Sequence, residues 1–263
     1  MNEPQIVQED KGTNSNTKWI LLIVGGGCVL LVCVCLVIAL AVAFFFPVTG
    51  NVFSEINEES GVPQPADEVY VTPQDLGTIL IPEKKNYPLV DDNKMGNPDA
   101  PVKIVIYSDF QCVYCRNYWN ETEPLIIENY VETGQVYYEY RSFGDFLGSQ
   151  SATAAEAAYC AGDQGQFWPY HEILFLNWTG EGSGDFSFAR QLGYAEALDL
   201  DVKTFSTCLE GGKYQYQIEE DLTNARTDDI RATPSFMING ELVEGALPYS
   251  EFEEVIEAAL SNE

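Results

Sequence analysis

Two cysteines separated by two residues, Cys112 and Cys115 (CVYC), stand between a predicted strand and a predicted helix. This arrangement restricts the fold more than any other feature of the chain. The preceding run, residues 102–108 (VKIVIYS), is short, apolar and β-branched, which is typical of a buried strand. The residues that follow repeat apolar side chains at helical spacing as far as Thr133. The motif therefore places Cys112 at the first turn of a helix that leaves a buried strand.

A second strand is expected after this helix. Pro124 should kink the helix and Gly134 should end it. Residues 135–143 (QVYYEYRSF) then favour a strand. A strand, a helix and a strand in this order predict a parallel βαβ unit with a right-handed crossover.

The remainder of the chain is first helical and then returns to strands. Residues 150–230 are expected to be helical in several segments separated by Gly-rich turns. Residues 235–238 (SFMI) predict a strand, the Asn-Gly pair at 239–240 a tight hairpin, and residues 241–243 the returning strand. Residues 249–260 form a final amphipathic helix. The order is βαβ, a helical block and ββα, which predicts an α/β fold.

Residues 19–46 contain no charged residue and exceed the ~20 apolar residues that a helix needs to cross a bilayer. Lys11 and Lys18 precede this segment, and the next Lys or Arg after it is Lys84. Because positive residues favour the cytoplasmic side, we expect a single-pass anchor with residues 1–18 in the cytoplasm and the rest outside. The alternative is a cleaved secretory signal, whose apolar region usually spans only ~7–15 residues.

The part of the chain after the anchor divides into a stalk and a domain. Residues 47–92 are rich in proline and acidic residues and predict a stalk. Within it and at the start of the domain, residues 68–72 and 78–81 could form short strands. The folded domain is expected over residues 93–263, with a helical insertion at about 147–229.

The chain is strongly acidic, with a formal net charge of −28 at pH 7. A surface of this sign repels nucleic-acid phosphates and anionic lipid headgroups. The sequence also holds no Lys/Arg cluster that would form a phosphate-binding patch. We therefore expect no nucleic-acid partner, and we attribute the acidity to solubility or to the protein's environment.

The position of Cys112 at a helix N-terminus favours an ionised sulfur, because free N–H groups and the helix dipole stabilise an anion there. The thiolate is the form that attacks disulfides. Cys115 lies one turn further on, on the same side of the helix, close enough to form a disulfide with Cys112. We expect an exposed, activated Cys112 with a pKa well below the ~8.5 of a free cysteine, and a sheltered Cys115.

A Cys-x-x-Cys motif also occurs as half of a zinc site or as a structural disulfide. A structural zinc site needs four ligands, whereas this chain has one histidine, His171. Its other extracytoplasmic cysteines, Cys160 and Cys208, form no second motif of this kind. No metal site is therefore expected. His171 lies among aromatic residues, which favours a packed residue over a catalytic base.

Four segments of the chain occur in the order typical of one family: MGNPDAPVKIVIYSDFQCVYC, YVETGQVYYEYRSF, CAGDQGQFWPYHEILF and ATPSFMING. Together they resemble the DsbA-like branch of the thioredoxin superfamily, from about Met95 to Glu263. The resemblance implies a thioredoxin-like α/β fold with an inserted helical domain, here preceded by one N-terminal transmembrane helix. It covers neither the apolar segment nor the stalk.

The resemblance also implies roles for individual residues. Cys112 would be the nucleophile and Cys115 the resolving cysteine. Pro234 would follow a cis peptide bond and lie beside the two cysteines. Thr233 would offer backbone hydrogen bonds to a bound substrate strand, and the helical insertion would shape the substrate groove.

The chain departs from the family pattern after the first cysteine, where proline is frequent and Val113 stands here. Val113 and Tyr114 occupy the two positions that tune the redox potential and contact substrate, so the resemblance leaves the oxidising strength open. Several relatives carry a buried acid in the first strand, where this chain has Ile106. Asp109 lies nearer to the motif and is expected to be solvated or to accept a hydrogen bond at the helix start.

Cys160 and Cys208 both fall in the predicted helical insertion. Some relatives bridge the corresponding positions, and an oxidising compartment favours a disulfide over two buried thiols. A second disulfide is therefore expected. Closing a loop of this span contributes roughly 4 kcal/mol in the chain-entropy model.

The sequence thus predicts a membrane-anchored thiol–disulfide oxidoreductase outside the cytoplasm, most simply an oxidase that passes the Cys112–Cys115 disulfide to exported proteins with cysteine thiols. It needs no cofactor, because the disulfide is the redox group, and a membrane quinone-linked partner is expected to reoxidise it. A reductase or isomerase is the alternative, since the potential sets the direction. A tethered, non-enzymatic peptide-binding or chaperone module is the alternative of another class.

Overall fold

The computed structural model describes residues 76–261. The predicted cytoplasmic tail, the predicted anchor at residues 19–46 and most of the predicted stalk lie outside the described residues. Among residues 76–261, no helix is both long enough and apolar enough to cross a membrane.

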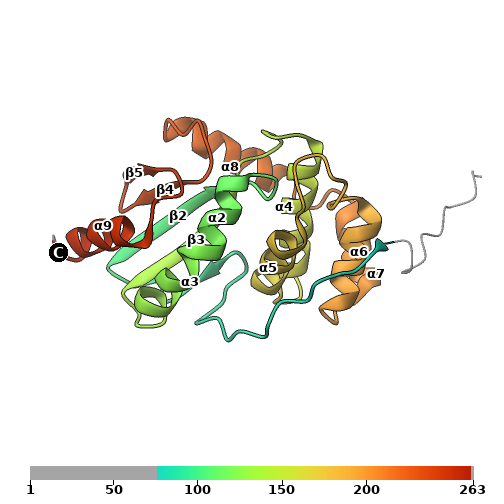
Figure 1. Cartoon of the computed structure of the whole chain (residues 1–263), viewed down its shortest axis with the longest axis horizontal. Coiled ribbons are helices and arrows are strands. Elements are labelled where there is room, and N and C mark those ends of the chain that lie inside the picture. Colours follow the sequence, from blue (N-terminus) through green and yellow to red (C-terminus); the bar gives the residue numbers. More distant parts are fainter. Residues whose placement is uncertain (1–75, 262–263) are drawn as a thin grey trace, which may run out of the picture. The chain divides into compact units, whose positions relative to one another are not determined.

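The described residues form a five-stranded sheet with helices packed around it (Figure 1). The strands are β1 Lys94–Met95, β2 Val102–Ser108, β3 Val136–Ser142, β4 Ser235–Ile238 and β5 Glu241–Glu244. Between β2 and β3 lie α2 Val113–Glu121, α3 Glu123–Ile126 and the π-helix η2 Ile127–Val131. The later helices are α4 Ser149–Gly162, α5 Phe167–Asn177, α6 Phe188–Ala197, α7 Val202–Glu210, α8 Gln215–Thr227 and α9 Tyr249–Ser261.

The strands lie in the order β1-β3-β2-β4-β5. β2 and β3 are parallel, with Val102 opposite Val136 and Ser108 opposite Ser142, as the predicted βαβ unit requires. β4 runs antiparallel to both β2 and β5. The strand from which the Cys112 turn leaves is therefore the central strand of the sheet.

The hairpin between β4 and β5 has the turn that the sequence predicts. Asn239 and Gly240 both have positive φ angles, 47° and 87°, as a type I′ turn requires. Ser235, the first residue of β4, lies opposite Tyr107 of β2. This register brings the segment just before β4 to the end of β2, where the Cys112 turn begins.

The helix after Cys112 is broken more than the sequence predicts. A single kinked helix as far as Thr133 is expected, but α2 ends at Glu121 and a new helix begins with Pro124 in its first turn. A five-residue π-helix follows. Gly134, with a φ angle of 78°, then ends the helical segment as expected.

Alternate residues of β2 face two different apolar clusters. Ile104 and Ile106 belong to the main core, which also contains residues of α2, α4, α5 and α9. Tyr107 points to the opposite face, into a small cluster with Ala225 of α8 and Ile230. The sheet is therefore covered on both faces, as the continuous apolar character of residues 102–108 indicates.

The helical insertion lies between β3 and β4 and gathers α4 to α7 beside the sheet in Figure 1. Its first helix, α4, is rich in alanines that are almost fully buried, which lets neighbouring helices pack close to it. A disulfide joins Cys160 of α4 to Cys208 of α7, with a Cα–Cα distance of 5.9 Å.

The described end of the predicted stalk, residues 76–92, packs against the helical insertion. Residues 78–81 form no strand, so that expectation is wrong. Instead, the backbone N–H of Leu80 donates to Asn177 Oδ1, and Asn177 Nδ2 donates to the carbonyl oxygen of Leu80, both at 2.7 Å. Lys85 forms an ion pair with Glu172 of α5.

Candidate redox site

The turn after β2 places Cys112 at the N-terminus of α2. The backbone N–H of Cys112 donates to the carbonyl oxygen of Asp109 at 3.0 Å, which closes the turn. Cys112 itself is the N-cap residue, and no side chain caps the helix. The first N–H groups of α2 are therefore free to act on the cysteine sulfur.

Several donors surround the sulfur of Cys112 and lower its pKa to about 6. The largest contribution is a hydrogen bond from the Cys115 thiol, which stabilises the thiolate. Burial opposes the shift, while the Thr233 side chain and the N–H groups of Cys115 and Tyr114 add to it. The helix N-terminus thus acts in the expected direction, but the partner thiol has the larger effect.

The pKa of Cys115 is shifted in the opposite direction. Only 1% of it is exposed, and burial raises its pKa well above the ordinary value, with the charge of Cys112 adding to the shift. Cys112 and Cys115 are both free thiols in this structure. The pair therefore combines one sulfur that ionises readily with one that holds its proton.

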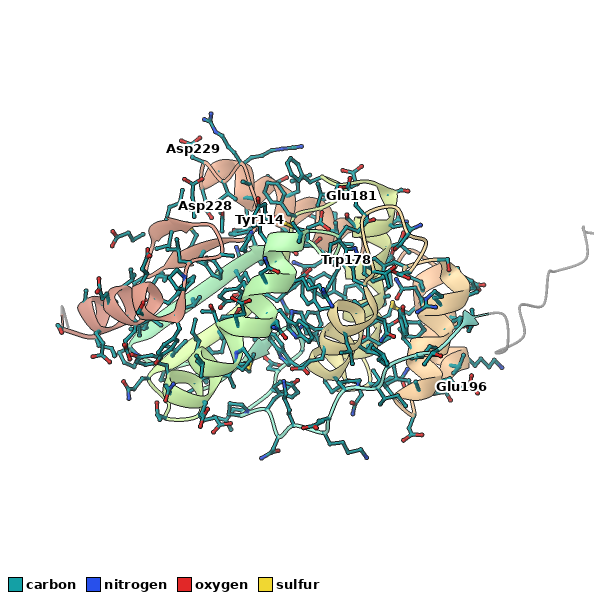
Figure 2. The ribbon with its side chains drawn as sticks, in the orientation of Figure 1. Tyr114, Trp178, Glu181, Glu196, Asp228 and Asp229 are labelled. Carbon is teal, nitrogen blue, oxygen red and sulfur yellow. A yellow bond between two sulfur atoms is a disulfide. The ribbon has the colours of Figure 1, made fainter. Side chains whose placement is uncertain are left out.

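Cys112 is less accessible than the sequence suggests, because only 7% of the residue is exposed. The exposed residues of the motif are Val113 (49%) and Tyr114 (62%), which project from the first turn of α2. Figure 2 labels Tyr114 there. The expectation of an exposed Cys112 is wrong, and a partner protein must meet Val113 and Tyr114 as it approaches the sulfur.

The segment before β4 lies directly against Cys112. The Thr233–Pro234 peptide bond is cis, and the Cys112 thiol donates to the carbonyl oxygen of Thr233 at 3.4 Å. The Thr233 Oγ1 atom is buried without a hydrogen-bond partner of ordinary geometry. The structure thus brings together four of the residues singled out from the sequence: Cys112, Cys115, Thr233 and Pro234.

His171 stands apart from this group. It is 1% exposed and packs against the rings of Phe110, Tyr140 and Phe175. Burial lowers its pKa to about 3, so it is neutral at physiological pH. It is a packed residue, as its aromatic surroundings in the sequence favour.

Two buried acids near the site escape sequence reasoning. Asp109 is 2% exposed, so the solvated role expected for it is wrong, although its Oδ1 atom does accept from the N–H of Gln111 at 2.8 Å. Glu123 is 3% exposed, and burial raises its pKa to about 8, while the Tyr138 hydroxyl donates to it at 3.0 Å. The one available signal was the position of Asp109 between a buried strand and the motif.

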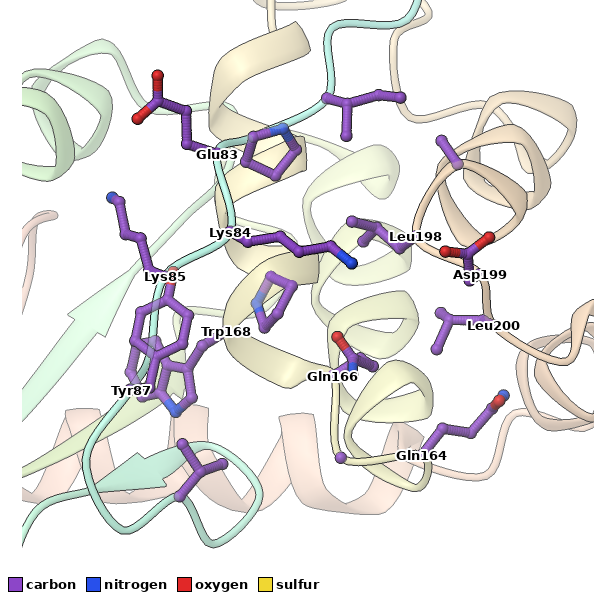
Figure 3. Close-up of a pocket in the computed structure, with 16 residues that line it drawn as sticks. Glu83, Lys84, Lys85, Tyr87, Gln164, Gln166, Trp168, Leu198, Asp199 and Leu200 are labelled. Carbon is purple, nitrogen blue, oxygen red and sulfur yellow. The ribbon is translucent and has the colours of Figure 1, made fainter.

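A cavity of about 560 Å³ lies elsewhere in the domain, between the segment before β1 and the helical insertion (Figure 3). Residues 81–90, 164–169 and 197–200 contribute its lining, so it includes no residue of the Cys112 turn. Lys84 extends into it toward Leu198 in Figure 3. Within residues 76–261, no group of three or more His, Cys, Asp or Glu side chains is placed to hold a metal ion.

Comparison with known proteins supports the fold described above. The family model described as "Thioredoxin" matches residues 89–258. Disulfide bond formation protein D of Bacillus subtilis is 28% identical over 180 residues, which cover 63% of this chain and 76% of that protein. The crystal structure of oxidised BdbD from Bacillus subtilis superposes with a TM-score of 0.60 at 25% identity, covering 65% of this chain and 93% of that one. The thioredoxin-like fold with an inserted helical region is thus confirmed.

A second kind of relative is much longer than the matching region. The Na(+)/H(+) antiporter NhaA 1 of Salinispora arenicola is 35% identical over 156 residues, which cover 59% of this chain. The match covers 22% of the antiporter's length. The chain therefore resembles only one part of that protein.

Proposed function

Because the chain belongs to the thioredoxin family and, within it, to the DsbA-like thiol–disulfide oxidoreductases, we propose that it oxidises cysteine thiols of exported proteins. Cys112 is the nucleophile and Cys115 the resolving cysteine. The observation that carries this assignment is the contrast between the two sulfurs, one with a lowered pKa and one with a raised pKa. Thiol–disulfide exchange needs one group that ionises and another that holds its proton.

The proposed reaction begins with the Cys112–Cys115 disulfide. A substrate thiolate attacks Cys112 Sγ, a substrate–Cys112 bond forms, and the electron pair of the broken bond goes to Cys115, which takes up a proton. A second substrate thiolate attacks the substrate sulfur, and Cys112 leaves as a thiolate. Two substrate thiols are oxidised and the enzyme is reduced to the dithiol.

The same contrast favours oxidation over reduction of substrates. The donors around Cys112 stabilise its thiolate, and therefore the reduced enzyme. A disulfide whose reduced form is stabilised is a stronger oxidant. Val113 and Tyr114 are exposed beside the sulfur and would contact the substrate, while the backbone of Thr233 would pair with its extended chain.

The location and partners are part of the proposal. Residues 19–46 would anchor the protein in the cell membrane, with residues 1–18 in the cytoplasm and residues 93–263 as the catalytic domain outside. Residues 47–92 would form the stalk, of which the described end, residues 76–92, packs against the helical insertion. A membrane quinone-linked partner would accept the two electrons and restore the disulfide. Proteolysis of intact cells tests the orientation, because protease added outside should remove the catalytic domain.

A direct test is to mix the oxidised protein with a reduced peptide that holds two cysteines. An oxidase should form the peptide disulfide faster than it reduces insulin in the presence of glutathione. A reductase would show the reverse order of rates. Failure of Cys112→Ser to lower either rate would contradict the assignment of the nucleophile.

A further inference from the structure

A buried hydrogen-bonded network lies behind Cys112 and ties its turn to the helical insertion. The amide of Gln111 donates to the hydroxyl of Ser151, in the first turn of α4, at 2.9 Å. The same amide accepts from the N–H of Gly182 at 3.3 Å. The Gln111 backbone N–H donates to Asp109 Oδ1 at 2.8 Å. Asp109, Gln111 and Ser151 are each at most 4% exposed, so water does not screen this network.

The second oxygen of Asp109, Oδ2, is buried without a hydrogen-bond partner of ordinary geometry. Burial raises the pKa of Asp109 to about 6. The Gln111 backbone N–H and the Ser151 hydroxyl lower this pKa, whereas the charge of Cys112 raises it. The carboxyl and the Cys112 sulfur are thus close enough for each charge to affect the other.

We propose that Asp109 is a positioning residue whose charge, in a turn tied through Gln111 to Ser151 of the helical insertion, opposes ionisation of Cys112 and so limits the oxidising strength of the site. This inference rests on the proposed role of Cys112 as nucleophile. Two like charges in a buried site disfavour each other. The N–H groups of α2 favour the Cys112 thiolate, and the charge of Asp109, three residues earlier in the same turn, counteracts them.

The other titratable groups that face this turn come from three elements. α2 contributes Cys115, whose proton is held by burial. β3 contributes Tyr140, whose pKa is raised by burial and then by the charges of Asp109 and Cys115. From α5, His171 packs against Phe110 and is neutral near pH 7. Of these groups, Asp109 is the one whose pKa, about 6, matches that of Cys112.

The substitution Asp109→Asn tests the charge with little change of shape, because an asparagine oxygen can still accept from the Gln111 N–H. Ser151→Ala removes the hydroxyl that stabilises the carboxylate, which should leave Asp109 neutral to a higher pH. Glu196→Gln is the matched control, since Glu196 is an exposed acid of α6 that takes no part in the network. Glu196 is labelled at the lower right of Figure 2, away from Tyr114.

The measurement is the pH dependence of Cys112 alkylation in the reduced full chain, with peptide mapping. Asp109→Asn should lower the midpoint by about one pH unit, the size of effect that a nearby charge has. Ser151→Ala should lower it less, and should add nothing in the Asp109→Asn background. The glutathione equilibrium should shift toward the dithiol in the same order.

Three outcomes would overturn the inference. The first is that the alkylation midpoint of Asp109→Asn equals that of Glu196→Gln. The second is that Ser151→Ala raises the alkylation midpoint. The third is that Ser151→Ala changes the midpoint equally in the wild-type and Asp109→Asn backgrounds. Should Asp109→Asn fail to fold, the midpoint of Ser151→Ala decides alone. A wild-type midpoint near 8.5 would instead contradict the proposed function, whatever the variants show, so the two failures are distinguishable.

Discussion

The described cysteines form two pairs whose surroundings differ. Cys112 and Cys115 lie within one turn at the start of α2 and are free thiols. Cys160 and Cys208 lie 48 positions apart and join α4 to α7. All four residues are at most 9% exposed. Burial alone therefore does not determine which pair exchanges with other proteins.

The difference lies in the groups that face each sulfur. Around Cys112, the Cys115 thiol, the Thr233 side chain and two backbone N–H groups stabilise a negative charge. All four cysteines belong to the main hydrophobic core, but the sulfurs of Cys160 and Cys208 are bonded to each other and join α4 to α7. The first pair is therefore suited to opening and closing, and the second to holding two helices together.

The largest difference between the two pairs is expected when the sulfurs of each pair are removed by substitution. Cys112→Ser should abolish oxidation of a dithiol peptide, because serine cannot form the mixed disulfide. The double variant Cys160→Ala/Cys208→Ala should keep the rate per folded molecule within a factor of about two, since its sulfurs do not touch the site. Rates are measured on folded protein quantified by near-ultraviolet circular dichroism. A comparable loss of rate in both variants would remove the distinction between the pairs.

The Cys160–Cys208 disulfide should instead affect the free energy of unfolding of the domain. Its loop spans 48 residues, and releasing such a loop costs roughly 4 kcal/mol in the chain-entropy model. We expect urea unfolding of the Cys160→Ala/Cys208→Ala variant to show a free energy of unfolding lower by about this amount. Cys115→Ala, measured beside reduced wild type, serves as the control for loss of a buried sulfur. An unchanged unfolding midpoint would show that the bridge does not stabilise the domain.

A smaller effect is expected in the pH dependence of the reduction potentials of the two cysteine pairs. Above pH 6 the reduced active pair holds one proton, on Cys115, because the pKa of Cys112 is lowered to about 6. Reduction then takes up two electrons and one proton, so the potential should fall by about 30 mV per pH unit, against about 59 mV below that pH. The Cys160–Cys208 pair should keep the steeper slope throughout. Glutathione titrations from pH 5 to 8 check this, and a single slope for both pairs would contradict it.

Local sequence patterns are sufficient to predict the elements that position the site. The apolar, β-branched run of residues 102–108 predicts β2, and the Asn239-Gly240 pair predicts the hairpin, because periodicity and turn chemistry act over a few residues. The CVYC motif predicts Cys112 at a helix start for the same reason. These are the parts of the fold in which each local preference agrees with the packing.

The features that local sequence patterns do not predict depend on residues far apart in the chain. Asp109 is buried because Ser151, which lies 42 positions later, packs against its turn through Gln111. Glu123 is buried where the hydroxyl of Tyr138, on β3, donates to it. The burial of Cys112 itself follows from the approach of Thr233. No pattern within a short window reports such contacts.

The central claim is that the Cys112–Cys115 pair, and not the other pair, transfers its disulfide to protein thiols. The most direct measurement is to incubate the fully oxidised protein with an excess of a reduced dithiol peptide, stop the reaction with an alkylating reagent, and map the labelled cysteines by mass. We predict one peptide disulfide formed per chain, with label on Cys112 and Cys115 and none on Cys160 or Cys208. Label on Cys160 and Cys208 with the first pair still bonded, or no transfer at all, would contradict the account.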